Sequence, residues 1–103
     1  MNRETLPPGL PVVWNEDART HLKAISAYIR RDSPQNAINM VERLLGATQS
    51  LGRFPQLYRV SQRVEGAREI PVPPYLILYE VSRTAVTILA VVHGRQKFPR
   101  SDS

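Results

Sequence analysis

Cysteine is absent from this 103-residue sequence. Without cysteine the chain can form no disulfide framework, and a zinc site of the cysteine-rich kind is excluded. Long apolar runs are also absent, since none approaches the roughly 20 residues of a membrane-spanning helix. The N-terminal residues lack the apolar core of a signal peptide. We therefore expect a cytoplasmic protein that does not enter a membrane.

The motifs of most cofactor-dependent enzymes are missing as well. The sequence contains no glycine-rich phosphate-binding loop, no dinucleotide fingerprint and no spaced set of zinc ligands. No serine lies in a nucleophile-elbow context. Histidine occurs only twice, as His21 and His93, and His21 falls within a helical pattern where a structural role is expected. The sequence therefore predicts no metal site and no cofactor.

Positive charge is what the chain has in excess. Fourteen lysine and arginine residues against nine aspartate and glutamate residues give a formal net charge of +5, and twelve of the fourteen are arginine. A basic protein favours anionic partners such as nucleic acid or an acidic protein segment. Arginine also suits paired hydrogen bonding to carboxylate or phosphate. A solvated surface accounts for such charge equally well, so composition leaves the kind of partner open.

Most of the strand pattern lies within residues 67–99. Residues 75–82 and 84–93 are rich in β-branched and aromatic side chains and are close enough in sequence to form an antiparallel hairpin. We expect this hairpin at the centre of a sheet. Residues 68–72 form a shorter segment, and Pro71 cannot donate a ladder hydrogen bond, so we expect an edge or irregular position for it.

Two helices are predicted before these strands. Residues 12–14 are β-prone, and Asn15 can cap a helix over residues 17–31. A second helix is predicted to begin with Ser33 as its cap and Pro34 in its first turn, and to end near residue 51, before a glycine. The short connection makes the two helices an antiparallel hairpin. The apolar positions of the first helix recur at spacings of four, three and four: Ala18, Leu22, Ile25 and Ile29.

These patterns predict the α+β class, with an N-terminal helical hairpin on one face of an antiparallel sheet of three to four strands. A chain of this length is expected to form one domain, which we assign to residues 12–99. Residues 1–11 hold three prolines and a glycine without periodicity and are expected to be a flexible arm. Residues 100–103 are expected to be a short tail.

A basic cluster follows the last predicted strand and is the main candidate for function. It contains His93, Arg95 and Lys97, which Arg68 and Arg100 could join. A histidine beside fixed positive charge can support metal-free RNA cleavage, in which it acts as acid or base while cations stabilise the phosphate. The same residues also suit electrostatic binding of a partner. A third interpretation gives His93 only the role of ending the strand.

Six segments, in their order and spacing, resemble the ParE/RelE superfamily of small bacterial toxins, which includes the plasmid stabilisation proteins. The resemblance covers about residues 12–99 and is greatest to the ParE branch. The segments are VVWNEDARTHLKAISAYI, SPQNA, LGRFPQLYR, GAREIPV, PYLILYEV and VTILAVVHGRQKFP.

The resemblance implies two helices packed on a twisted antiparallel sheet. It also implies a toxin of a type II toxin-antitoxin system, neutralised in a hetero-oligomer by an antitoxin that wraps it. ParE-like members inhibit DNA gyrase by binding it, whereas RelE-like members cleave mRNA on the ribosome. We expect the antitoxin to be acidic and partly disordered before it binds. The apolar residues of the helical hairpin that we expect it to contact are Leu22, Ile25, Ile29, Val41 and Leu45.

One departure from the RelE pattern favours the ParE branch. RelE-like nucleases generally carry an arginine after the tyrosine that opens the third strand, and Leu76 occupies that position here. Phe98, which has no hydroxyl, occupies the position where such a nuclease would be expected to carry a hydroxyl-bearing aromatic residue. We therefore expect a gyrase-binding inhibitor, whose target-facing residues are Arg68, His93, Arg95, Gln96 and Lys97.

Two alternatives remain open. In a RelE-like nuclease His93 would act as acid or base, while Arg68 and Arg95 would bind phosphate. The other alternative is an inactive family member kept as a partner or repressor component, whose expression would not slow growth.

Overall fold

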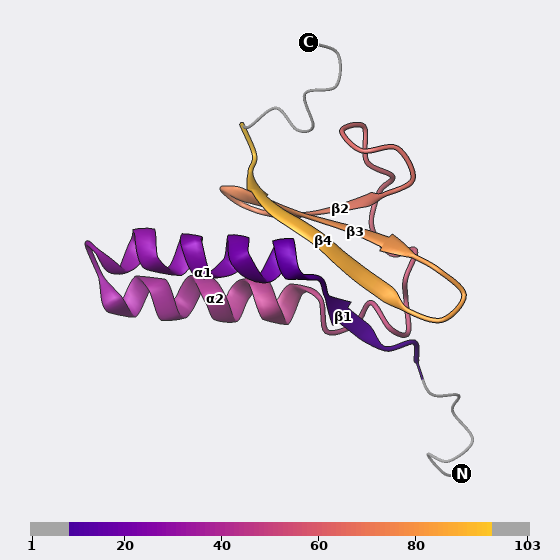
Figure 1. The fold of residues 1–103 in the computed structure, drawn as a ribbon, viewed down its shortest axis with the longest axis horizontal. Helices are drawn as coiled ribbons and strands as arrows, with labels where there is room; N and C mark the ends of the chain where they lie inside the picture. The colour runs from indigo at the N-terminus through magenta and orange to yellow at the C-terminus, as the bar shows by residue number, and fades with distance from the viewer. Residues whose placement is uncertain (1–8, 96–103) are drawn as a thin grey trace, which may run out of the picture.

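The fold consists of two helices on one face of a four-stranded sheet (Figure 1). We describe residues 9–95 of a computed structural model. The arrangement confirms the α+β prediction with its N-terminal helical hairpin. The elements in chain order are β1 (Val12–Trp14), α1 (Glu16–Arg30), α2 (Pro34–Ala47), β2 (Arg68–Val72), β3 (Tyr75–Val81) and β4 (Val86–His93).

The strand order in the sheet is β1-β4-β3-β2. The β3–β4 hairpin therefore lies at the centre, as predicted. The expectation of a wholly antiparallel sheet was wrong at one edge, because β1 pairs with β4 in the parallel direction. Hydrogen bonds from the N–H of Val86 to the carbonyl of Pro11 (2.9 Å) and from the N–H of Asn15 to the carbonyl of Ile88 (3.1 Å) fix that pairing. A strand of three residues carries no local signal for the direction of a partner more than 70 residues later in the sequence.

The opposite edge of the sheet is β2, in agreement with the prediction. The N–H of Glu69 points away from β3 and donates to the carbonyl of Arg59 (3.0 Å). Alternate residues of a strand direct their N–H groups to the same side, so the nitrogen of Pro71 also faces outward. Because proline has no N–H, this part of the edge offers no donor to another strand.

Both helices begin at the predicted caps. The side chain of Asn15 accepts a hydrogen bond from the N–H of Ala18 (2.8 Å), and that of Ser33 accepts one from the N–H of Asn36 (3.1 Å). The second helix ends earlier than predicted, at Ala47 instead of near residue 51. The hydroxyl of Thr48 donates to the carbonyl of Leu45 (2.9 Å), and the chain then continues in turns.

Gly52 therefore has a role other than ending the helix. Its carbonyl accepts a hydrogen bond from the N–H of Leu10 (3.0 Å). A Cβ atom on Gly52 would collide with the carbonyl oxygen of Leu10, so only glycine permits this approach. The contact ties residues 9–11 to the turn after α2, while residues 1–8, the rest of the expected arm, lie outside the described residues.

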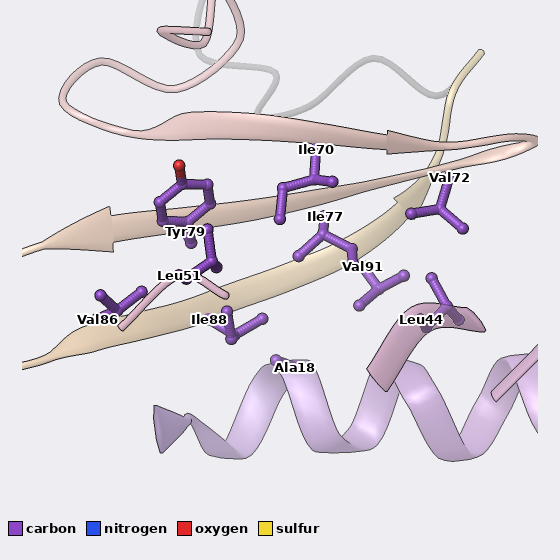
Figure 2. Close-up of a cluster of buried hydrophobic side chains, with 10 residues drawn as sticks. All are labelled: Ala18, Leu44, Leu51, Ile70, Val72, Ile77, Tyr79, Val86, Ile88 and Val91. Atoms are coloured by element: carbon purple, nitrogen blue, oxygen red, sulfur yellow. The ribbon is translucent and has the colours of Figure 1, made fainter. Parts of the chain in front are cut away.

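The core fills the space between the helices and the sheet, and Figure 2 shows ten of its side chains. Tyr79 is fully buried, and its hydroxyl donates to the carbonyl of Pro55 (2.8 Å). Burial is the largest cause that raises the pKa of Tyr79. This hydrogen bond fastens the long loop between α2 and β2 to the centre of the sheet. The buried side chains are Ala18, Leu44, Leu51, Ile70, Val72, Ile77, Tyr79, Val86, Ile88 and Val91.

His21 accepts a hydrogen bond from strand β4 close to a β-bulge in that strand. Leu78 pairs with Ala90, whereas the next residue of β3, Tyr79, pairs with Ile88. The β4 residue between Ile88 and Ala90 therefore has no partner in β3 and forms the bulge. Near this irregularity, the N–H of Val91 donates to Nδ1 of His21 (3.1 Å). The helix α1 thus supplies an acceptor for an amide of the sheet, and Nδ1 must carry no proton to accept this hydrogen bond.

Replacing His21 by alanine is expected to lower the free energy of unfolding by about 1 to 3 kcal/mol, the usual cost of leaving a buried donor unsatisfied. The measurement is urea unfolding followed by circular dichroism. The matched control is His21→Asn, because the asparagine side-chain oxygen can take the place of Nδ1 as acceptor. We expect this variant to recover most of the lost stability. Equal destabilisation of the two variants would show that packing, and not the hydrogen bond, is the contribution of His21.

Candidate target-binding site at the exit of strand β4

The exit of β4 presents His93 and Arg95 together on the surface. Both residues are exposed, and Nδ1 of His93 accepts a hydrogen bond from the N–H of Arg95 (3.2 Å). The ring of His93 meets Tyr75 edge-on, with 5.8 Å between centroids and an interplanar angle of 76°. Between the two site residues, the N–H of Gly94 donates to the carbonyl of Pro74 (2.7 Å). The His93–Arg95 turn is therefore joined to the start of β3.

Tyr75 connects this turn to the helical hairpin. It is partly buried against the core. Burial raises the pKa of Tyr75, and the neighbouring Tyr28 raises it further, so the phenol stays protonated at neutral pH. Tyr28 itself is 67% exposed near the end of α1. An aromatic surface thus borders the turn on its helical side.

Arg68 does not join this cluster. It pairs with Tyr79, near the far end of β3, whereas His93 pairs with Tyr75 at the start of that strand. The Nη1 atom of Arg68 donates to the carbonyl of Tyr58 (2.7 Å), which holds the side chain against the α2–β2 loop. The expectation that Arg68 could lie beside His93 was wrong, because the sheet register separates them along the strands. Gln96, Lys97, Phe98 and Arg100 lie outside the described residues.

Arg63, which sequence reasoning did not place in the site, occupies the position expected for Arg68. Its Nη2 atom donates to the carbonyl of Gly94 (2.8 Å), across 31 residues of sequence. Its Nε atom lies 3.5 Å from Oε2 of Glu69. A basic side chain from the α2–β2 loop therefore contacts the turn directly.

Glu69 is the buried charge at the centre of this arrangement. The residue is 3% exposed, although it lies on an edge strand. Nη2 of Arg59 lies 3.0 Å from its Oε1 atom, and the hydroxyl of Ser61 donates to its Oε2 atom (2.8 Å). Together with Arg63, the carboxylate has two guanidinium partners. The three side chains of Arg59, Arg63 and Glu69 therefore carry one net positive charge. A cavity of about 300 Å³ opens beside it, lined by Arg59, Gln62, Arg63 and Glu69.

Leu76 is a packing residue. It is 6% exposed and, with Leu78, alternates along β3 with the core residues Ile77 and Tyr79. Alternate residues of a strand face opposite sides, so Leu76 lies on the face away from the helices. It belongs there to a second apolar cluster, and its position therefore supplies packing and no charge. This second cluster consists of Leu76, Leu78, Ala90 and Val92, with Val64 and Leu89 packed against it.

Residues 12–98 match the family described as the ParE toxin of the type II toxin-antitoxin system parDE. The chain belongs to the ParE toxin family. This result, together with the fold, confirms the resemblance to the ParE/RelE superfamily.

Two curated relatives of this ParE-family chain are named as toxins. The putative toxin Y4kP of Sinorhizobium fredii is 36% identical over 89 residues, which covers 84% of this chain and 91% of the relative. Toxin RelE2 of Caulobacter vibrioides is 39% identical over 84 residues, which covers 81% of this chain and 93% of the relative. Both names therefore indicate a toxin, and the second relative is named for the RelE branch.

Solved structures confirm the fold of the ParE-family chain. The chromosomal ParDE system of P. aeruginosa contains a chain that matches with a TM-score of 0.71 at 21% identity, over 82% of this chain and 95% of that one. A chain of the RelBE2 toxin-antitoxin complex of Mycobacterium tuberculosis matches with a TM-score of 0.55 at 24% identity, over 82% and 98%. Two helices on a mixed sheet are thus the shared architecture.

The apolar residues proposed for the antitoxin lie in different places on the helical hairpin. Leu22 and Val41 line one groove, together with Lys23, Ser26 and Arg30. Ile29 lines a separate groove. Ile25 packs partly against the core, whereas Leu45 is 41% exposed. The hairpin therefore offers a groove with apolar walls and basic residues, and a separate exposed leucine.

Within residues 9–95, no group of three or more histidine, cysteine, aspartate and glutamate side chains could hold a metal ion. Neither of the two helices in that part of the chain has the length and apolarity to cross a membrane.

Proposed function

We propose that this type II toxin acts as a ParE-like inhibitor that binds DNA gyrase, with His93 and Arg95 facing the target. The observation that carries the proposal is the buried position of Leu76. A RelE-like nuclease is expected to use an arginine at this position to stabilise charge on the phosphate. Electrostatic stabilisation is usually the largest contribution to such chemistry, so its loss weakens the case for cleavage far more than the case for binding.

The surroundings of His93 support the same choice. A nuclease of the kind considered above would need Arg68 beside His93, but Arg68 lies along the sheet against Tyr58. Arg59 and Arg63 of the α2–β2 loop do not take over the phosphate-binding role of Arg68, because both pair with the carboxylate of Glu69. In the part of the turn that the structure describes, His93 and Arg95 are exposed, a pair suited to recognition by charge and hydrogen bonding.

The test is a plasmid supercoiling reaction with purified bacterial gyrase and the full chain alone. We expect loss of supercoiling and accumulation of linear DNA, which marks gyrase trapped with cleaved DNA. A folded protein that leaves supercoiling unchanged would contradict the proposal. Primer extension on translated mRNA distinguishes the main alternative, since codon-positioned cuts soon after induction would favour a RelE-like nuclease. If expression leaves growth unchanged, the inactive-member alternative gains support.

We also propose an acidic antitoxin as the partner of the helical hairpin. The groove lined by Leu22 and Val41 is bordered by Lys23 and Arg30, which suits a segment with apolar and acidic side chains. Leu45 offers a further apolar contact, being 41% exposed. The product of the neighbouring small reading frame is expected to copurify with the tagged toxin. Its failure to do so would argue against this partner.

A further inference from the structure

The turn that carries His93 and Arg95 is held from two sides. On one side, the N–H of Gly94 donates to the carbonyl of Pro74, at 2.7 Å. On the other, the carbonyl of Gly94 accepts from Nη2 of Arg63, at 2.8 Å. The first bond comes from the connection between β2 and β3, and the second from the α2–β2 loop. The central peptide groups of the turn are therefore fixed by two segments distant in sequence from β4.

Arg63 is itself held in place. Its backbone N–H donates to the hydroxyl of Ser61 (2.9 Å), and its Nε atom lies 3.5 Å from Oε2 of Glu69. The same hydroxyl donates to Glu69 (2.8 Å), so the backbone and the side chain of Arg63 are anchored to one carboxylate. The guanidinium, with its side chain 28% exposed, is thus oriented before any target binds.

A buried carboxylate needs an explanation at this position. Removing a carboxylate from water is costly, and a buried ion pair is often no more stabilising than a well-packed apolar group. Glu69 pairs in register with Leu78, next to the apolar cluster on the face away from the helices, so packing alone would favour an apolar residue there. What a carboxylate adds at this position is its contact to Arg63, and Arg63 in turn donates a hydrogen bond to the turn.

We propose that Glu69 and Arg63 are positioning residues, which hold the Gly94 turn so that His93 and Arg95 face the target in a fixed arrangement. The inference rests on the proposed function, since it assigns a role within the same target-binding site. Neither residue need touch the target. Fixing a binding loop before association strengthens binding because less conformational entropy is lost when the complex forms.

The decisive comparison is Arg63→Gln against Arg59→Gln. Both variants remove one positive charge that pairs with Glu69, but of these two arginines it is Arg63 that also donates a hydrogen bond to the turn. For Arg63→Gln we expect the toxin concentration for half-maximal gyrase inhibition to rise about tenfold, and for Arg59→Gln to stay within about twofold. Hydrogen exchange of the Gly94 and Arg95 amides should accelerate about tenfold in Arg63→Gln alone.

Each outcome decides a separate question. Equal potency and equal exchange in the two variants would overturn the inference. If the unmodified chain does not inhibit gyrase, the proposed function fails, while the exchange comparison still tests whether Arg63 fixes the turn. Should Arg63→Gln not fold, Arg63→Lys serves instead, since it keeps the charge but lacks the fork that reaches Glu69 and Gly94 together. Faster exchange at Gly94 in that variant would support the inference, and unchanged exchange would overturn it.

Discussion

Replacing Leu44 by alanine is expected to lower the free energy of unfolding by about 3 kcal/mol, within the usual range for a leucine removed from a core. Leu44 is fully buried and belongs to the core cluster between the helices and the sheet that Figure 2 shows. Truncation would remove apolar burial and leave a cavity that the surrounding helix and strand cannot fill by small shifts. The measurement is urea unfolding. Thermal unfolding of the same variant should show a Tm that is lower by about 12 to 24 °C, as expected for a domain of this size.

The neighbouring residue provides the control for this prediction. Leu45→Ala makes the same chemical change one position later in α2, where the side chain is 41% exposed. We expect its free energy of unfolding to stay within about 0.5 kcal/mol of the unmodified chain, as for most surface substitutions. Similar destabilisation by both variants would mean that α2 does not present the described face to the sheet.

The helices were predictable because their information is local. The apolar residues Ala18, Leu22 and Ile25 recur at helical spacing, and Asn15 and Ser33 are side chains whose capping role depends on residues three positions later. The end of α2 was less predictable, since Thr48 closes the helix through a hydrogen bond that competes with continuation of the helical pattern. Periodicity shows which face a helix buries, but its end depends on such competition.

The sheet was predictable only in part, because strand pairing depends on distant segments. The β3–β4 hairpin follows from closeness in sequence, whereas the parallel pairing of β1 with β4 does not. The same limit applied to Arg68. Its place beside Tyr79 depends on the register of β2 against β3, which no pattern within residues 68–72 specifies. Sequence reasoning therefore found the turn of the candidate site but supplied it with the wrong arginine.

A signal for the buried charge cluster that supports the site was present in the sequence. Arg59, Ser61 and Arg63 alternate in the loop before β2, and Glu69 interrupts a strand that is otherwise suited to burial. A lone glutamate in a strand is usually exposed. The burial of Glu69 depends on the pairing of the loop with β2 through Val60 and Arg68, which the sequence pattern does not show. Opposite charges that alternate on facing segments are therefore worth testing as a buried cluster in related chains.

Removing both side chains of the target-facing turn is expected to have the largest effect on activity. For His93→Ala combined with Arg95→Ala we expect gyrase inhibition to weaken roughly 30- to 100-fold, the loss of about 2 to 3 kcal/mol that central interface residues contribute. Both side chains are exposed, so the free energy of unfolding should change little. The measurement is the toxin concentration that halves supercoiling by purified gyrase, with thermal unfolding recorded on the same samples.

Arg83→Ala is the matched control for this pair of substitutions. It removes one arginine, as the double variant also does, but from the exposed turn between β3 and β4, at the other end of β4. We expect inhibition by Arg83→Ala to remain within about twofold of the unmodified chain, because a charge distant from the interface adds little to affinity. If the two variants lost inhibition equally, net charge would determine binding, and the exit of β4 would not be the target-facing surface. If the double variant kept full inhibition, gyrase would have to be bound through another part of the toxin.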